Sequence, residues 1–486
     1  MSNPNLVGRL RNEAAPEATR TSRRFEASSA GCGALALTTR RGTMRIPLTK
    51  YLAAAIALCA TLQRPATAQD AAPDYARATL SGDWHGACSF AWQAGYAWDA
   101  TLKVDTLHNH GGMTPGSRSM SHSELRLKAD LARIAEREGA TAYLHVLDNR
   151  SAGINARHSG SVMGVSNIEV PVPSTRIFHA WLQQNFLNDR FSLLAGLYPI
   201  DSEFFVMDSA SLLLHPSFGT PADLALTRGP SVFNNSAFGV RAKWQSTNRE
   251  AYVMGALMDG IPNDPARPTA TAIRFARGDG SFVIAELGWM PPETGHVIDA
   301  TEPVRGFADQ MPGGPDNNNG ISKYAIGFWR YDNRVFDQLD VDAGNAPLQR
   351  RSQGAYLLAE RTLTGLGDAG RDLTAFPRHS ISDGNSTAID RVWNLGLRLR
   401  GPLPGRPEDT LVVGWTESRL AGKWRAAQAA AGATTADREG AIEITWRAAL
   451  APWPALQPTL QSIRHPGGGG GVPRATVFGL RVEIAL

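Results

Sequence analysis

The sequence predicts an all-β protein, a transmembrane antiparallel β-barrel of about sixteen strands with short periplasmic turns and long extracellular loops. Three observations lead to this fold class. Runs of alternating apolar and polar residues recur from residue 96 to the end of the chain. The connections alternate between tight turns, such as 136–139 and 188–190, and long loops, such as 108–121 and 291–320. Aromatic residues recur near the expected strand ends, as they do at membrane interfaces: Tyr96, Trp98, Trp244, Trp289, Trp393 and Trp415.

Membrane-spanning helices do not fit the composition. Hydrophobic residues make up 43% of the chain, which is too few for a bundle of such helices. The longest apolar run, 51–60, is too short to cross a bilayer as a helix. If the protein lies in a membrane, it therefore crosses it with strands.

The N-terminal residues read as segments that precede the mature protein. Residues 44–68 have the pattern of a signal peptide: a basic start, an apolar run and the Ala-Thr-Ala site that ends at Ala68, after which we expect cleavage. Residues 1–43 show no sustained periodicity, and we interpret them as an over-called extension, with translation starting at Met44. An unusually long basic region of the signal peptide is the alternative.

Removal of these segments changes the charge and the cysteine count. The whole chain is formally +4, but residues 1–43 carry seven Arg against three acids and residues 44–68 carry three basic residues, so the mature part is −3. We therefore expect no nucleic-acid partner. Cys88 alone remains, which excludes an intrachain disulfide. The histidines are scattered, and we expect no metal and no cofactor.

Residues 69–95 precede the barrel and form an N-terminal periplasmic segment. Trp84, Phe90 and Trp92 stand here among small and polar residues. Such a segment is either an ordered arm at the periplasmic end or a plug in the pore. The barrel itself is expected over residues 96–486.

One hairpin, within 164–205, illustrates the barrel design. In the strand 176–186, apolar Phe178, Ala180, Leu182 and Phe186 alternate with His179, Trp181, Gln183 and Asn185. After the turn 188–190, the strand 191–199 repeats the alternation. A period of two with unlike faces is typical of a strand between two environments.

Other strands show the same two faces. The apolar sets are Tyr96, Trp98, Ala100, Leu102 and Val104; Leu125, Leu127, Ala129 and Leu131; Phe238, Val240, Ala242 and Trp244; Trp393, Leu395, Leu397 and Leu399; and Ile442, Ile444 and Trp446. Residues 475–486 alternate likewise and form the closing strand. The polar face of 124–130 carries both signs of charge. In lipid every backbone group must be paired, and strands achieve this only in a closed barrel.

Several motifs resemble the carbohydrate-selective outer-membrane porin family, the OprB-type porins. They are LSGDWHGA at 80–87, GVSNIE at 164–169, TRIFHAWLQQNF at 175–186, SLLAGLYPIDSEFF at 192–205, FGTP at 218–221 and APWPALQPTLQSIRHPGGG at 451–469. The resemblance covers roughly residues 80–486. One departure is the terminal Leu486, where such barrels usually end in an aromatic residue that the assembly machinery reads.

The resemblance implies a function and a location. It implies passive, carbohydrate-selective diffusion of sugars through a water-filled channel, and not an enzyme. It implies the outer membrane of a Gram-negative bacterium. The expected partners are mono- or oligosaccharide solutes, outer-membrane lipids and the barrel-assembly machinery, and the barrel is a monomer or a homotrimer.

A candidate solute site lies around the hairpin. Sugars present hydroxyls and flat apolar faces, so a site for them needs bidentate polar groups and aromatic platforms. Arg176, Glu169 and Trp181 are the first candidates, followed by Glu203, Arg157, Asp201 and Asn167. If the loop 150–174 folds inward, it narrows the channel and brings Glu169 near the wall. Each of these residues is otherwise an ordinary charge of the lumen or a loop ion pair.

Two other protein classes stay open at this point. One is an outer-membrane barrel enzyme that hydrolyses lipids or esters, although Ser202 beside Glu203 lacks a motif such as G-x-S-x-G. The other is a soluble periplasmic sugar-binding β-sandwich, whose strands also have one polar face.

Overall fold

The computed structural model describes residues 72–151, 153–291, 322–365 and 371–486. The proposed extension 1–43 and signal peptide 44–68 lie outside the described residues. The strands of the barrel are β1 Tyr96–Gly111, β2 Gly116–Asp130, β3 Ala140–Arg150, β4 Ser174–Phe186, β5 Phe191–Tyr198, β6 Ala237–Gln245, β7 Ala251–Asp259, β8 Ser281–Trp289, β9 Ser322–Tyr331, β12 Gln353–Gly365, β13 Asp372–Ser382, β14 Ile389–Arg400, β15 Thr410–Leu420, β16 Arg438–Ala449, β17 Pro454–Arg464 and β18 Ala475–Ala485.

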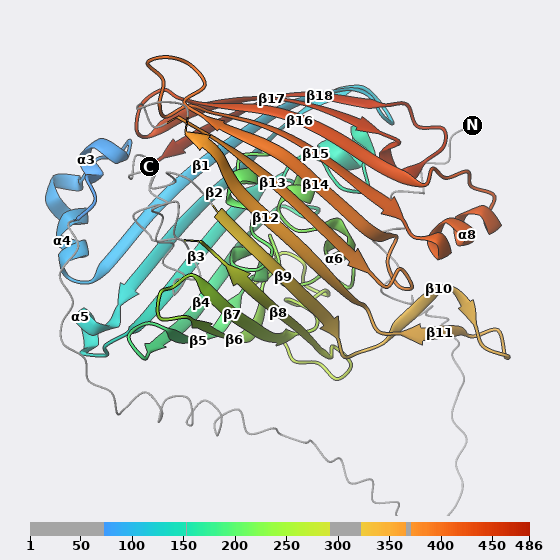
Figure 1. Ribbon diagram of the computed structural model, residues 1–486, viewed down its shortest axis with the longest axis horizontal. Coiled ribbons are helices and arrows are strands. Elements are labelled where there is room, and N and C mark those ends of the chain that lie inside the picture. Colours follow the sequence, from blue (N-terminus) through green and yellow to red (C-terminus); the bar gives the residue numbers. More distant parts are fainter. Residues whose placement is uncertain (1–71, 152, 292–321, 366–370) are drawn as a thin grey trace, which may run out of the picture. The chain divides into compact units, whose positions relative to one another are not determined.

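These sixteen strands of the described chain form one closed antiparallel barrel (Figure 1). Each strand pairs with its neighbours in sequence, except that β9 pairs with β12 across a small outer hairpin. The barrel closes where β1 pairs with β18, from Thr101 opposite Ala485 to Gly111 opposite Ala475. The predicted fold class and strand number are confirmed. Closure leaves no unpaired sheet edge, as a barrel in lipid requires.

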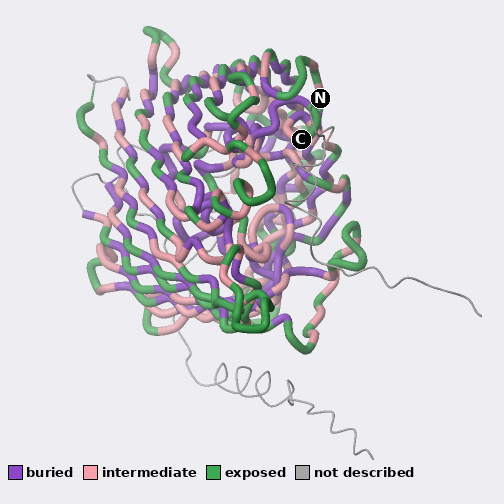
Figure 2. The backbone as a smooth tube through the Cα atoms, turned by 90° about the vertical axis from the view of Figure 1, so that its right-hand side faces the viewer, coloured by how far each residue is buried: buried purple, intermediate pink, exposed green. Residues whose placement is uncertain are grey.

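The two faces of the strands differ as the alternation predicts. On β14, Leu395 and Leu397 are 43% and 46% exposed on the outside, whereas Asn394 and Arg398, which flank them, are buried on the inside. Figure 2 shows this alternation of buried and exposed positions along the strands. The barrel is therefore apolar outside and polar within, which is the reverse of a soluble protein and suits a wall between lipid and water.

The connections distinguish the two ends of the barrel. One end, called the turn end here, carries the described connections 131–139, 187–190, 246–250, 401–409 and 450–453. The other, called the loop end, carries 112–115, 153–173, 199–236, 260–280, 332–352, 383–388, 421–437 and 465–474. The longest of the described connections, 153–173, 199–236, 260–280 and 332–352, thus all lie at the loop end, although the short connection 112–115 lies there too.

One of the expected long loops is wrong, and another lies mostly outside the described residues. Strands β1 and β2 continue to Gly111 and from Gly116, so 108–121 is mostly strand. The expectation failed because the outward side chains of this part are polar, while the pairing continues beyond the apolar band. Most of 291–320 lies outside the described residues. The strands that flank it are described: β8 ends and β9 begins at the turn end of the barrel.

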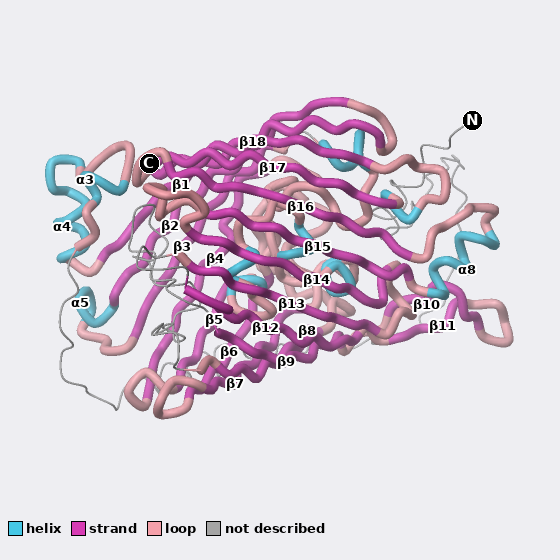
Figure 3. Tube along the Cα trace, turned by 45° about the horizontal axis from the view of Figure 1, so that its top comes forward, coloured by secondary structure: helices cyan, strands magenta, loops and turns pink. Residues whose placement is uncertain are grey.

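Two loop-end connections enter the barrel. We call them the first inner segment, 153–173, and the second inner segment, 199–236. The second contains the short helix α6 Ala222–Ala225 and several single helical turns. Figure 3 shows loops and short helices inside the ring of strands. The sequence left an inward course of the first segment open as a possibility and pointed to none for the second.

The remaining elements lie around the barrel ends. Helices α3 Tyr75–Ala78 and α4 Ala87–Gln93 pack on the start of β1, where the rings of Trp84 and Trp98 are 4.5 Å apart. The N-terminal segment is therefore an ordered arm at the turn end and not a plug. Helix α5 Leu131–Ala135 lies at the same end. At the loop end, α8 Gly422–Ala430 packs on the hairpin of β10 Val335–Val341 and β11 Pro347–Arg350. No helix among the described residues is long and apolar enough to cross a membrane.

A bulge in β4 corrects one assignment of faces. The register between β3 and β4 shifts where His145 pairs with His179 and Val146 pairs with Ile177, which leaves Phe178 unpaired. Phe178 is consequently buried, although the simple alternation placed it on the apolar outer face. The bulge also turns Arg176 inward together with His179. Even-numbered residues before the bulge and odd-numbered residues after it therefore face the lumen.

A charge on the outer face should destabilise the barrel. Leu395→Arg places a guanidinium in the apolar band of β14 and should cost about 2–4 kcal/mol of unfolding free energy. The measurement is reversible urea unfolding in lipid vesicles. Leu403→Arg, the same change in the exposed connection 401–409, is the control and should cost little. Equal losses from both changes would contradict the lipid-facing assignment of Leu395.

Candidate functional site

Carboxylates of the wall hold the inner segments by their backbone. Glu443 on β16 accepts hydrogen bonds from the backbone N–H groups of Leu214 and His215, at 2.7 and 2.8 Å. On the same strand, Glu439 accepts from Val162 and Met163 at 3.0 and 3.2 Å. One strand therefore fixes both inner segments, and the buried amides obtain the partners that they need.

Other strands of the wall, from β13 round to β8, repeat this arrangement. Glu286 on β8 accepts from the N–H of Phe205 at 2.8 Å, and Glu360 on β12 accepts from that of Ser209 at 2.6 Å. Arg378 on β13 is buried and donates to the backbone carbonyls of Phe205, Gly219 and Ser217 at 2.9, 2.6 and 2.5 Å. These charge-assisted bonds fix the second inner segment across the lumen.

Apolar packing accompanies the polar contacts on this side. Phe204, Phe205, Leu213 and Phe218 of the second inner segment belong to one buried cluster with wall residues such as Tyr252, Tyr356 and Phe376. The ring of Phe205 meets that of Tyr356 edge to face at 5.8 Å. The inner segment is thus packed against β7, β12 and β13, which leaves free space on the other side of the lumen.

A cavity of about 400 Å³ occupies that space. The wall lines it with Lys103 of β1, Glu124 of β2, and Arg481 and Glu483 of β18. The inner segments line it with polar groups such as Asn167 and Asp201 and with the apolar side chains of Ile168, Leu212 and Phe233. The lining combines both signs of charge with flat apolar surface, a combination that can hold a polar neutral molecule.

Most charges at the cavity are paired. Lys103 Nζ lies 3.3 Å from Glu124 Oε1, and Arg481 Nε lies 2.7 Å from Asp105 Oδ1. The second nitrogen of the Arg481 fork donates to Asn167 Oδ1 at 2.7 Å. Pairing keeps the net charge of the cavity low while the fixed dipoles remain available to hydroxyl groups.

Two of the predicted site residues line this cavity. Asn167 reaches it from the first inner segment and also donates to the Leu213 carbonyl at 3.3 Å. Asp201 reaches it from the start of the second segment and accepts from the Phe233 N–H at 2.8 Å. The structure brings these two residues together although they lie on different connections.

Two of the three first candidates, Trp181 and Arg176, lie in the packed wall. Trp181 is 5% exposed and stacks on Tyr143 with a centroid distance of 5.0 Å, so neither face of its indole is offered to a solute. Arg176 is 6% exposed. It donates to Ser174 Oγ at 2.8 Å, to Asn235 Oδ1 and to the Pro268 carbonyl. The structure therefore gives both residues a structural role, because the bulge and a distant loop supply partners that the strand pattern does not reveal.

The other three candidates also make structural contacts. Glu203 is buried, with Arg241 Nε at 2.8 Å and Lys243 Nζ at 3.2 Å, and ties the second inner segment to β6. Glu169 accepts from the backbone N–H of Asn155 at 3.0 Å within the first inner segment. The side chain of Arg157 is exposed in that segment, and its carbonyl accepts from Thr114 Oγ1 at 2.8 Å.

The wall residues of the cavity were missed as site residues. Lys103, Glu124, Arg481 and Glu483 all stand at polar positions of clean strands, so the sequence did place them on the inner face. Their grouping follows from closure of the barrel between β1 and β18, where Lys103 pairs in register with Glu483. That pairing joins residues 380 positions apart, as the difference of the two residue numbers shows, and local patterns do not contain it.

Burial of Asp201 changes its protonation. Its carboxylate lies in the connection between β5 and β6, outside the spanning strands. Enclosure in the barrel raises its pKa to about 6, although the hydrogen bond from the Phe233 N–H favours the charged form.

Within the described residues, no group of three His, Cys, Asp or Glu side chains could hold a metal ion. The cavity thus offers hydrogen bonds and charge to a solute.

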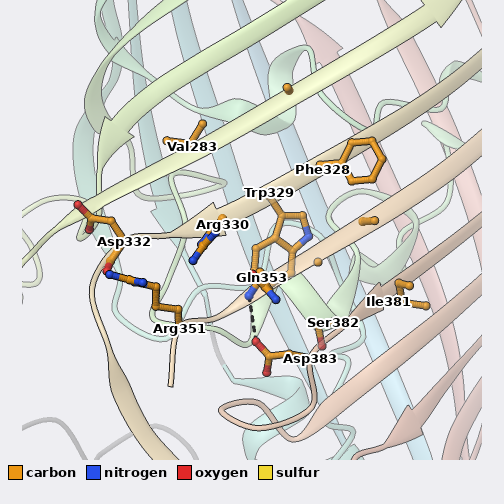
Figure 4. Close-up of a pocket in the computed structure, with 13 residues that line it drawn as sticks. Val283, Phe328, Trp329, Arg330, Asp332, Arg351, Gln353, Ile381, Ser382 and Asp383 are labelled. Carbon is orange, nitrogen blue, oxygen red and sulfur yellow. Dashed lines mark hydrogen bonds between the residues drawn. The ribbon is translucent and has the colours of Figure 1, made fainter. Parts of the chain in front are cut away.

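A larger hollow lies outside the barrel and has a different character. It has a volume of about 910 Å³ and is lined by outward residues of β8, β9, β12 and β13 near the loop end (Figure 4). Its floor contains Val283, Phe328 and Ile381, which belong to the apolar outer face. This hollow opens away from the lumen, so the inner cavity is the candidate for a solute.

Comparison with known proteins gives concordant results. Residues 115–486 match the family described as "Carbohydrate-selective porin, OprB family". Porin B of Pseudomonas aeruginosa is 21% identical over 442 residues, which cover 84% of this chain and 91% of that protein.

Two solved structures share the fold. The high-pH structure of Pseudomonas putida OprB has a TM-score of 0.70 at 17% identity and covers 86% of this chain and 100% of its own. The low-pH structure has a TM-score of 0.51 at 14% identity, with coverages of 84% and 98%.

Loss of a wall carboxylate should loosen the inner segments. Glu443→Gln replaces one acceptor oxygen by an amide donor and leaves a backbone N–H without its partner, which should cost about 1–3 kcal/mol. The larger conformational freedom of 213–215 should appear as increased current noise in planar bilayers. Glu417→Gln on the outer face, where the ion pair with Arg438 is exposed, is the control. If Glu443→Gln showed neither increased current noise nor reduced stability, the anchoring role would be contradicted.

The charge of Asp201 should make ion selectivity depend on pH. Below about pH 6 the carboxyl is protonated, so the cavity loses one negative charge and cation selectivity should fall as the pH decreases through 6. Because burial raises this pKa above the unfolded value, the group should also destabilise the fold as the pH rises through 6. Reversal potentials between pH 5 and 7.5, compared with Asp201→Asn, measure the effect. An identical pH profile in the Asp201→Asn variant would contradict the assignment of this effect to Asp201.

Proposed function

We propose, for a chain that belongs to the carbohydrate-selective OprB family of porins, that sugars cross the barrel through the cavity at Asn167 and Asp201. The protein is an outer-membrane porin for sugars, a passive channel and not an enzyme. The observation that supports the proposed path is the arrangement of the two inner segments. They fill the side of the lumen next to β7, β12 and β13 and leave the cavity beside β1, β2 and β18.

The chemistry of the cavity fits a sugar. Hydroxyl groups both donate and accept, and here carboxylates, a guanidinium and an amide stand within one small space. Ile168 and Phe233 supply apolar surface for the carbon-bound faces of the ring. Paired opposite charges give a neutral solute hydrogen bonds, whereas a single ion meets both attraction and repulsion. Asn167, Asp201, Arg481 and Lys103 are therefore the proposed contacts.

The other predicted site residues support this path indirectly. Arg176 and Glu203 hold the connections around the second inner segment, and Glu169 shapes the first. Trp181 packs in the wall. Their proposed role is to keep the opening at one size, because a site for hydroxyl groups loses selectivity when its partners move.

The setting of the barrel is part of the proposal. We place the turn end in the periplasm and the loop end outside the cell, with residues 44–68 removed as a signal peptide after Ala68. Outer-membrane lipids surround the apolar face, and the barrel-assembly machinery inserts the chain. The assembled protein is a monomer or a homotrimer.

Removal of a proposed contact should weaken sugar binding. Asn167→Ala and Asp201→Ala should each cost about 1–3 kcal/mol of sugar affinity, because a hydroxyl loses its partner. The measurement is the block of ion current by a panel of mono- and disaccharides in planar bilayers. Arg157→Ala, which changes an exposed residue of the same inner segment, is the matched control and should leave the affinity unchanged. If both cavity variants fold and keep the parent's affinity for every sugar, the path lies elsewhere in the lumen.

A further inference from the structure

The outer face of β15, β16 and β17 carries a third hollow near the loop end, with a volume of about 330 Å³. Its lower part is formed by Trp415 and Ile442, which point outward from adjacent strands. Its upper part is lined by Arg438, Arg464 and Arg474. The hollow thus begins in the apolar band and ends among guanidinium groups, at the level where a bilayer changes from acyl chains to headgroups.

The strand register explains why the surface is hollow there. Trp415 pairs with Ile442, which pairs with Ser462. One step toward the loop end, Gly440 pairs with Glu417 on one side and Arg464 on the other. Gly440 has no side chain between these two long residues, and it therefore leaves the space that the arginines surround.

The positive charges of this hollow exceed the negative ones. Arg438 is paired with Glu417 at 3.1 Å and with Asp437 at 2.8 Å. Arg464 and Arg474 are exposed, and in the part of the chain that the structure describes their guanidinium groups have no ion-pair or hydrogen-bond partner. His465, also exposed, lies beside them. Two free guanidinium groups above an apolar floor attract an anion that carries an apolar tail.

We propose that this hollow binds an anionic lipid of the leaflet at the loop end, through a phosphate whose charge no cation of the same headgroup neutralises. The phosphate lies between Arg464 and Arg474, whose planar forks match its oxygens. An acyl chain of the same lipid lies over Trp415 and Ile442. A free phosphate would use only the upper part, so the apolar floor points to the lipid.

The larger outer hollow of Figure 4 provides a matched comparison. It also has an apolar floor and two arginines, Arg330 and Arg351, but Asp332 and Asp383 line it as well. Arg351 Nε donates to the Asp332 carbonyl at 2.7 Å. The two arginines and the two aspartates balance in charge, so this hollow should not bind an anionic headgroup in preference to a neutral one.

The test is native mass spectrometry of the purified full chain in neutral detergent. The probes are lipid A with two phosphates, lipid A with one phosphate, and phosphatidylethanolamine. For the parent we expect the tightest binding to the diphosphorylated lipid and weaker binding at higher salt. The variant Arg464→Gln/Arg474→Gln should bind it about 30-fold more weakly, since each surface arginine contributes roughly one factor of five.

Two further variants test whether the effect is specific to this hollow and to the guanidinium group. Arg330→Gln/Arg351→Gln, in the balanced hollow, should retain the parent's affinity. Arg464→Lys/Arg474→Lys keeps the charge but loses the fork, and its affinity should lie between those of the parent and the Gln variant. All arginines concerned are exposed, so folding should persist, and heat-dependent migration in gels checks it. Equal affinity for all three lipids, equal losses from both Gln pairs, or occupation of the hollow by a second copy of the chain would overturn the proposal.

Discussion

Backbone groups that leave the sheet and enter the lumen still need hydrogen-bond partners, and this requirement governs the interior of the barrel. The inner segments 153–173 and 199–236 have little regular structure of their own to satisfy it. Inward-facing carboxylates such as Glu439 and Glu443 accept from their amides, and Arg378 donates to their carbonyls. A charged side chain that binds backbone in this way is both satisfied and held in place, so polar residues inside the wall act as anchors.

The anchors also determine where the channel is open. On the side of β7, β12 and β13, they act together with an apolar cluster that includes Phe205 and Tyr356, and the lumen is filled there. On the side of β1, β2 and β18, the inward side chains pair with one another, as Lys103 does with Glu124, and a cavity remains. The selectivity for solutes therefore depends on how the wall residues are divided. Some hold an inner segment and close part of the lumen, and others line the open cavity.

The sequence predicted the wall well, because each strand carries its own signal. The alternation of Leu395 and Leu397 with Asn394 and Arg398 needs no distant partner, since lipid and lumen impose it on every strand. The limits of this signal are physical too. Beyond Val104 the outward side chains of β1 become polar, so the pattern fades although the strand continues to Gly111.

The interior could be predicted only in part. Asn167 and Asp201 could be named from the sequence because both belong to the connections that flank the hairpin of β4 and β5, and both line the cavity. Trp181 was expected to face a solute, and its inward direction was right, but the adjacent Tyr143 covers it. The Leu214 amide that donates to Glu443 lies 229 residues away in the chain. Such contacts depend on the closed barrel, and no local pattern contains them.

Amide hydrogen exchange of the folded barrel tests the anchoring most directly. The account predicts that Val162, Met163, Leu214 and His215 exchange as slowly as amides of the strands, because a wall carboxylate holds each of them. The loop-end connection 421–437, outside the lumen, should exchange faster at its exposed turns. Rapid exchange at those four amides, comparable with that of the outer connection, would contradict the account.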